Sequence, residues 1–307
     1  MTRVLKAYRL KKGDKIGIIA PAGPIKEDEL KEGIRILKDH GFQIELSRSL
    51  FKSSNLGYIA GSIKERVDDL HEMFERKDIK AILCARGGYG SMQLLEYIDY
   101  ELIKKNPKMF IGYSDITALH LAFLKKIRFI TFHGPMLKDL VYLHHYYLKM
   151  FFFAIKGEMP NNITEKRAKT LIPGTTEGIL IGGNLSIISH LIGTPYLPIL
   201  DNMILFLEDI NEPYYKIDRM LTHLKLSGIF KNVSGLILGL FKNCGKQDLI
   251  EQIITEIVSD LDFPILSNFS IGHSDKNLTI PLGIRVCLDA EKKSIEFLES
   301  PIKNEAF

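Results

Sequence analysis

Ser114 is the residue of this 307-residue chain whose setting most directly indicates chemistry. It follows a short apolar run and precedes a helix-like segment, in the motif Gly-Tyr-Ser-Asp. A serine at a tight strand-to-helix turn has the geometry of a nucleophile elbow, which exposes the hydroxyl oxygen beside the free N–H groups of the new helix. Ile116 stands where hydrolase elbows have a second glycine, so Ser114 or Asp115 could instead simply cap the helix.

An acid that could support such a serine occurs in the second half of the chain. Glu208 and Asp209 follow a run of five apolar residues, 203–207, and an acid in this position either caps the next segment or orients a histidine. Because side chains alternate along a strand, the two carboxylates should point to opposite faces.

The candidate bases are two of the nine histidines. Only His133 and His273 follow strand-like runs and adjoin glycine turns. Ser114, Glu208 and His273 then give the chain order serine, acid, histidine, as in one group of known triads. The other histidines fall within or at the ends of predicted helices and are interpreted as surface or packing residues: His40, His71, His120, His144, His145, His190 and His223.

A glycine-rich segment, Arg86-Gly87-Gly88-Tyr89-Gly90, follows another apolar run. Glycines allow the backbone to approach a ligand closely and to offer N–H donors. The segment matches neither the dinucleotide-binding fingerprint nor the P-loop pattern. It could supply an oxyanion hole to a neighbouring strand, bind a phosphate, or form only a turn.

Strand-like and helix-like segments alternate through the first half of the chain. We expect strands at 15–20, 43–46, 79–85 and 129–132, a further strand in the short apolar run after Pro107 that ends in Gly-Tyr-Ser-Asp, and helices at 27–40, 63–76 and 118–124. This alternation predicts an α/β fold with a parallel, doubly wound sheet and a site at the C-terminal ends of its strands.

The periodicity lapses in a polar stretch, which we interpret as a linker. The predicted division is an N-terminal domain at 1–156 that carries the nucleophile, a linker at 157–174, and a smaller mixed α/β domain at 175–307 that carries the acid and the base. In the last part we expect strands at 177–181, 203–207, 233–241, 264–266 and 278–281, helices at 185–191, 215–226 and 249–258, and a hairpin that turns at 290–293.

Composition and charge narrow the class of protein. The 41 basic and 37 acidic residues give a net charge of +4, which is too even to favour nucleic-acid binding, and no basic stripe is present. No apolar run approaches the roughly 20 residues that span a bilayer, and the first residues do not form a secretory signal. The three cysteines have no metal-type spacing. We therefore expect a cytoplasmic enzyme or binding protein with no metal and no other cofactor.

Taken together, the motifs resemble those of the LD-carboxypeptidases of peptidoglycan recycling. The segments that carry the resemblance are Gly-Tyr-Ser-Asp at 112–115, Arg-Gly-Gly-Tyr-Gly at 86–90, Phe-Leu-Glu-Asp at 206–209 with Asp-Arg-Met-Leu at 218–221, and Gly-His-Ser at 272–274 with Leu-Thr-Ile-Pro-Leu-Gly at 278–283. The similarity extends from about residue 20 to about residue 289. It implies a metal-free serine peptidase with a Rossmann-like N-terminal domain, a smaller C-terminal domain and the site between them.

Matched residue by residue, the resemblance implies that Ser114 is the nucleophile, Glu208 the orienting acid and His273 the general base. The oxyanion donors would be the backbone N–H groups of Asp115 and Gly88, although the choice between Gly87 and Gly88 stays open. The family elbow is also Gly-x-Ser-Asp, so Ile116 does not count against the match.

The resemblance also implies a substrate and an assembly. The family cuts the bond between an L-configured centre and a terminal D-alanine in murein peptides within the cytoplasm, and its members are commonly homodimers. A sister branch resembles the microcin C self-immunity proteins, which act on peptide-nucleotide conjugates. An alternative of another class is a non-catalytic nucleotide- or sugar-binding α/β protein that uses the loop at 86–90.

Overall fold

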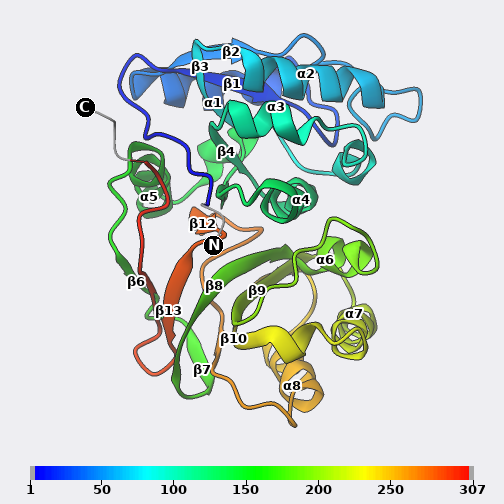
Figure 1. Cartoon of the computed structure of the whole chain (residues 1–307), viewed down its shortest axis with the longest axis vertical. Coiled ribbons are helices and arrows are strands. Elements are labelled where there is room, and N and C mark those ends of the chain that lie inside the picture. Colours follow the sequence, from blue (N-terminus) through cyan, green and yellow to red (C-terminus); the bar gives the residue numbers. More distant parts are fainter. Residues whose placement is uncertain (1–3, 304–307) are drawn as a thin grey trace.

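The computed structural model describes residues 4–303 and contains two β-sheets, one above the other in Figure 1. The upper sheet has six strands and the lower sheet has eight. Within the described residues, no helix is long and apolar enough to cross a bilayer.

The six-stranded sheet is built almost entirely from the first half of the chain. Its strands, in order across the sheet, are β12 (Ile280–Leu282), β5 (Thr131–His133), β4 (Met109–Gly112), β3 (Ile79–Cys84), β1 (Lys15–Ile19) and β2 (Gln43–Leu46). β1 to β5 are parallel to one another, as the sequence predicts. β3 and β4 are short and largely or wholly buried apolar runs, as expected for strands covered on both faces.

Helices connect these strands and cover the sheet. They are α1 (Glu27–Asp39), α2 (Ile63–Glu75), α3 (Tyr100–Lys105), α4 (Thr117–Ile127) and α5 (His145–Lys156). Short 3₁₀ helices occur at η1 (Ser91–Leu94), η2 (Ser114–Ile116) and η3 (Leu137–Tyr142). The chemistry-bearing loops follow β3 and β4, so the parallel arrangement brings them to the same edge of the sheet.

β12 belongs to the second half of the chain but pairs with the first sheet. It lies antiparallel to β5, with Ile280 opposite His133. This pairing was not predicted from the sequence, because a three-residue apolar strand does not reveal its partner. Its consequence is that the loop before β12, which contains His273, lies beside the loops that follow β4 and β5.

The eight-stranded sheet is mixed. Its strands, in order across the sheet, are β6 (Asn162–Thr164), β14 (Ser294–Phe297), β13 (Arg285–Asp289), β8 (Thr175–Asn184), β9 (Met203–Ile210), β10 (Val233–Lys242), β11 (Ile265–Ser267) and β7 (Lys169–Ile172). β8 to β11 are parallel, and the outer strands are antiparallel. Helices α6 (Leu185–Leu191), α7 (Tyr214–Leu226) and α8 (Gln247–Ile257) lie along one side of this sheet in Figure 1, with η4 (Ile229–Asn232) between α7 and β10.

The polar stretch at 157–174, interpreted from the sequence as a linker, contains two strands. β6 and β7 are the two edges of the second sheet. Edge strands face water on one side and are often polar, which explains why their sequences resemble a loop. The division into domains at 1–156 and 175–307 stays a prediction.

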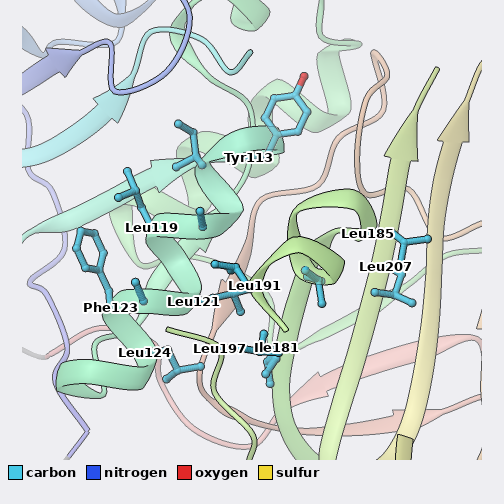
Figure 2. Close-up of a cluster of buried hydrophobic side chains, with 14 of the residues drawn as sticks. Tyr113, Leu119, Leu121, Phe123, Leu124, Ile181, Leu185, Leu191, Leu197 and Leu207 are labelled. Carbon is cyan, nitrogen blue, oxygen red and sulfur yellow. The ribbon is translucent and has the colours of Figure 1, made fainter. Parts of the chain in front are cut away.

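A continuous apolar core joins the two halves of the molecule. Figure 1 shows α4 above α6, and in Figure 2 Leu121 and Leu124 lie beside Leu191 and Leu197. Leu121 also lines a small apolar hollow together with Ile181 of β8. Ser114 immediately precedes α4, and Glu208 lies near the end of β9, so this shared core fixes the two residues relative to each other.

Candidate active site

Ser114 occupies a strained turn between β4 and α4. Its backbone φ is 64°, a left-handed conformation that costs an ordinary residue on the order of 1–3 kcal/mol and that is typical of a nucleophile elbow. A Cβ on Gly112 would lie 2.9 Å from Cγ2 of Ile116. The turn is therefore tight enough to require Gly112, while Ile116 packs over it at the place where hydrolase elbows have a second glycine.

Three side chains from three distant segments form a hydrogen-bonded chain at this turn. Nε2 of His273 lies 3.0 Å from Oγ of Ser114, and Nδ1 of His273 lies 2.6 Å from Oε2 of Glu208. A carboxylate can only accept, so Nδ1 carries the proton and Nε2 accepts the hydroxyl of Ser114. The structure thus brings together the three residues that the sequence proposed as nucleophile, base and acid.

Gly272 makes the approach of Glu208 to His273 possible. Its φ is +117°, and a Cβ there would lie 2.7 Å from Oε2 of Glu208. The Glu208 side chain is fully buried, and that of His273 is 11% exposed. Oε1 of Glu208 has no hydrogen-bond partner, so the carboxylate interacts with His273 through Oε2.

The surroundings of His273 favour its protonated form. Burial by itself lowers the pKa of the imidazole, but the charge and the hydrogen bond of Glu208 raise it, with further contributions from Asp209 and Asp139. The net result is a pKa above 6.5. A raised pKa makes the neutral imidazole a stronger base toward the hydroxyl of a serine.

Asp209 points away from the histidine, to the start of α6. Its carboxylate accepts hydrogen bonds from Nδ2 of Asn184 at 2.9 Å and from both N and Oγ of Ser186, at 2.9 and 2.8 Å. Burial is the main cause of a raised pKa for Asp209. Its contacts assign it a structural task at the N-terminus of α6.

The glycine-rich loop after β3 lies against the serine. A Cβ on Gly87 would be 2.9 Å from Cβ and 3.0 Å from Oγ of Ser114, so only glycine allows this approach. The carbonyl of Gly87 accepts a hydrogen bond from N of Gly23 at 3.0 Å. Gly87 is buried, whereas Gly88 is exposed and has a φ of +118°.

Asp115 and Ser91 connect this loop to the elbow. The carboxylate Oδ2 of Asp115 accepts hydrogen bonds from N and Oγ of Ser91, at 2.8 and 2.5 Å. Burial raises the pKa of Asp115, although these hydrogen bonds oppose the shift. Sequence reasoning considered Asp115 as a helix cap or a backbone donor and missed this link, because nothing in the spacing pairs it with Ser91.

The contact of Tyr113 with His273 was also not predicted from the sequence. Its ring lies 4.8 Å from that of His273, centroid to centroid, and 5.7 Å from that of His133. The Tyr113 hydroxyl hydrogen-bonds to Asp139 of η3. Tyr113 thus packs against His273, and its position next to the elbow serine was the available signal.

His133 and His120, both buried, make no hydrogen bond to Ser114 or Glu208 among the described residues. His133 is fully buried in β5, neither ring nitrogen has a hydrogen-bond partner, and burial lowers its pKa far below 6.5. His120 of α4 bonds to Thr131 Oγ1 at 2.8 Å and to the carbonyl of Gly112 at 2.9 Å, which confirms its interpretation as a packing residue. Among residues 4–303, no group of three or more His, Cys, Asp or Glu side chains could hold a metal ion.

Comparisons with known families give matches over both halves of the chain. The family model described as the LD-carboxypeptidase N-terminal domain matches residues 16–134, and the one described as the LD-carboxypeptidase C-terminal domain matches residues 177–288. The two matches include every residue that the sequence proposed for the site.

Individual relatives agree with the family match. A probable murein peptide carboxypeptidase of Bacillus subtilis is 38% identical over 94% of this chain and 93% of its own length. The structure of MccF in complex with glutamyl sulfamoyl guanosine has a TM-score of 0.89 and 28% identity, covering 97% of this chain and 100% of that one. The structure of a muramoyltetrapeptide carboxypeptidase from Oxalobacter formigenes has a TM-score of 0.81 and 30% identity, covering 92% and 97%.

Proposed function

The chain belongs to the LD-carboxypeptidase family, and on this premise we propose that it is a serine-type carboxypeptidase that releases the terminal D-alanine from murein tetrapeptides. The observation that carries the proposal is the hydrogen-bonded chain from Ser114 through His273 to Glu208. It supplies the nucleophile, the base and the orienting acid that acyl transfer requires.

The proposed reaction follows from these contacts. His273 Nε2 takes the proton of Ser114 while Oγ attacks the carbonyl that precedes D-alanine. His273 then returns the proton to the leaving amine, and water hydrolyses the acyl-enzyme by the same route. Glu208 holds the imidazole in the required tautomer and stabilises its charge when it is protonated.

Two backbone N–H groups are proposed to stabilise the oxyanion. That of Asp115 lies in the first turn at the elbow, where N–H groups have no partner within the helix. In a trans peptide the carbonyl and the next N–H point in opposite directions. Because the Gly87 carbonyl is directed at Gly23, the N–H of Gly88 points away from Gly23, which favours Gly88 over Gly87 as the second donor.

Synthetic peptides test the proposal. Incubated with L-Ala-D-Glu-L-Lys-D-Ala, or with its diaminopimelate form, the protein should release one D-alanine, and the isomer that ends in L-alanine should be spared. Ser114→Ala should remove the activity and also labelling by a fluorophosphonate probe, while leaving the fold intact. Rapid cleavage of the L-alanine isomer, or cleavage of neither peptide, contradicts the proposed function.

The similarity to MccF supports a second candidate with the same chemistry and another substrate. In that case the acyl group would be removed from a peptide-nucleotide conjugate. Mass spectrometry after incubation with the tetrapeptide and with an aminoacyl sulfamoyl nucleoside, in parallel, separates the two candidates by which substrate is consumed faster.

Membership of the family also supports proposals about the location, the oligomeric state and the partners of the protein. We propose a homodimer that works in the cytoplasm on murein peptides, with neither nucleic acid nor membrane as a partner. Light scattering coupled to size-exclusion chromatography checks the dimer, and fractionation of cells checks the location.

A further inference from the structure

We propose that Arg86 binds the terminal carboxylate of the substrate and thereby restricts the enzyme to the last peptide bond. This inference rests on the proposed function and deepens it. A carboxypeptidase differs from an endopeptidase in requiring a free carboxylate next to the bond that is cut. The site described so far accounts for bond cleavage but contains no cation to recognise that group.

Arg86 lies in the loop that contacts Ser114. It directly precedes Gly87, the residue that lies against Cβ and Oγ of Ser114. In a peptide substrate, the carboxylate carbon of the last residue lies roughly 4 Å from the scissile carbonyl carbon, because the two are separated by one nitrogen and one Cα. A group that recognises the carboxylate must therefore lie close to the loop that surrounds the oxyanion, where Arg86 is.

The guanidinium of Arg86 has N–H donors without a hydrogen-bond partner among the described residues. Nη1 donates to the carbonyl of Pro24 at 3.0 Å, whereas Nε is buried and has no hydrogen-bond partner. A buried donor without a partner is uncommon and calls for an explanation, such as a group that the site binds. The side chain as a whole is only half-buried, so a ligand can reach it.

Arg86 also lacks an acidic partner among the described residues. Arg35, Arg76 and Arg285 form ion pairs with carboxylates, while no carboxylate within residues 4–303 pairs with Arg86. A guanidinium matches the two oxygens of a carboxylate in a bidentate arrangement, and this makes arginine the preferred residue for such recognition. The carboxylate of a substrate would supply the negatively charged partner that Arg86 lacks within the described part of the chain.

The neighbouring arginine does not compete for this role. Arg66 donates from Nη1 to the carbonyls of Pro21 and Gly90, both at 2.8 Å, and from Nη2 to Gln93 at 2.8 Å. It is buried and holds the loop after β1 against the glycine-rich loop. Lys138 is a second cation near the site, since its backbone N–H bonds to the carbonyl of Ala85, and it serves as the control.

The test compares two substrates that differ only in charge. One is L-Ala-D-Glu-L-Lys-D-Ala, and the other is the same peptide ending in D-alaninamide. We expect the wild-type enzyme to favour the acid by roughly 100-fold in kcat/KM, the size of effect seen when one partner of a desolvated charge pair is removed. Arg86→Met should lower kcat/KM for the acid by about this factor, mainly through KM, and should leave the rate on the amide within about threefold.

Control variants make the result specific to Arg86. Arg86→Lys keeps the charge and should retain an intermediate preference for the acid, and Lys138→Met should retain the full preference. Fluorophosphonate labelling of Ser114 reports whether each variant keeps an intact site. If Arg86→Met is not labelled, the comparison of the two substrates with Arg86→Lys decides.

Several outcomes would overturn the inference, and they are distinct from failure of the proposed function. Equal losses on acid and amide in Arg86→Met would show that Arg86 only supports the loop. Loss of the preference in Lys138→Met would assign the carboxylate to that residue. Equal cleavage of both peptides by the wild type removes the inference but leaves the proposed function standing, whereas cleavage of neither removes both.

Discussion

Glu208 and Asp209 are neighbours in the chain and have different surroundings. Oε2 of Glu208 lies 2.6 Å from Nδ1 of His273, while Asp209 bonds to Asn184 and Ser186 at the start of α6. The alternation of side chains along β9 produces this separation. Removing the carboxylate of Glu208 should therefore have a different effect from removing that of Asp209.

Glu208→Gln should lower kcat far more than Asp209→Asn does. Without the carboxylate, the imidazole is free to adopt the wrong tautomer, a change that costs on the order of 10⁴-fold in the serine-protease example. Asp209→Asn keeps the shape of the group at α6 and should cost mainly stability. Steady-state kinetics and thermal melting of both variants check this, and a larger loss of kcat in Asp209→Asn would show that the assignment of the acid is wrong.

The pH dependence of the reaction should report on His273. The base must be neutral to accept the proton of Ser114, and Glu208 raises the pKa of the imidazole above 6.5 against the effect of burial. Activity should therefore rise with pH through a midpoint above 6.5, and Glu208→Gln should move this midpoint down. The stability that the His273–Glu208 pair contributes should be complete below about pH 6.5 and decline as pH rises through the folded-state pKa. A pH–rate profile with a midpoint well below 6.5 would contradict this.

Sequence reasoning identified residues that motifs mark and missed those that only the fold brings together. Ser114, Glu208 and His273 each follow an apolar run, which is a local signal, and the structure places them in one hydrogen-bonded chain. Their roles in catalysis stay a prediction. The contacts of Asp115 with Ser91 and of Tyr113 with His273 depend on how separate loops pack, and no spacing reveals them.

At the scale of elements, one loop brings His273 to Ser114 and Glu208. β12 pairs with β5 of the first sheet, while Glu208 lies on β9 of the second sheet, so the loop containing Gly272 and His273 passes between the sheets. An isolated bridge between Leu240 and Gly272 supports it at the end of β10. Gly272 therefore has two tasks. Its backbone connects the loop to β10, and its lack of a side chain leaves room for Glu208.

Gly272→Ala should separate Glu208 from His273. The new Cβ would lie 2.7 Å from Oε2, and φ at this position is +117°, so either the carboxylate or the loop must move. We expect kcat to fall by at least roughly tenfold, because a small displacement of a catalytic group has a large effect on rate. Gly13→Ala is the matched control, since φ there is +93° and a Cβ would meet nothing within 4 Å.

Kinetics and thermal melting of the two alanine variants separate the backbone strain of alanine at positive φ from the steric clash with Glu208. Both should lose some stability, because alanine is unfavourable at positive φ. Only Gly272→Ala should also lose activity. Equal activities in the two variants would show that the contact between residue 272 and Glu208 does not matter for the reaction.

The elements themselves were predictable to different degrees. Largely or wholly buried strands such as β3 and β4 have mainly apolar sequences and were predicted close to their observed bounds. β6 and β7 were not, because they are short edge strands with polar residues. The joining of β12 to the first sheet depends on contacts far apart in the sequence, which local patterns do not report.

At the scale of the whole molecule, the two halves share a core. The largest buried cluster includes Phe110 and Leu121 from the first half and Leu191 and Leu238 from the second. Inter-domain contacts of ordinary size permit independent motion, whereas a large apolar contact opposes it. The proposed site combines Ser114 from one half with Glu208 from the other, so the shared core also sets the distance between these two residues.

Leu121→Ala should therefore affect stability and activity together. Leu121 is 1% exposed and lines an apolar hollow with Ile181 and Leu205 of the other half. Truncation of a buried leucine costs about 2–5 kcal/mol. The matched control is Leu37→Ala, a fully buried leucine of α1 in a separate cluster that contains only residues of the first half and of the C-terminal end.

Because the halves share a core, calorimetry should give a single unfolding transition for the wild type and for both variants, shifted to lower temperature in each. At equal loss of stability, Leu121→Ala should lower kcat more than Leu37→Ala, since only Leu121 lies between the segments that carry Ser114 and Glu208. Two separate transitions, with Leu37→Ala shifting only one of them, would show that the halves fold independently and that the catalytic distances are set by the loops alone.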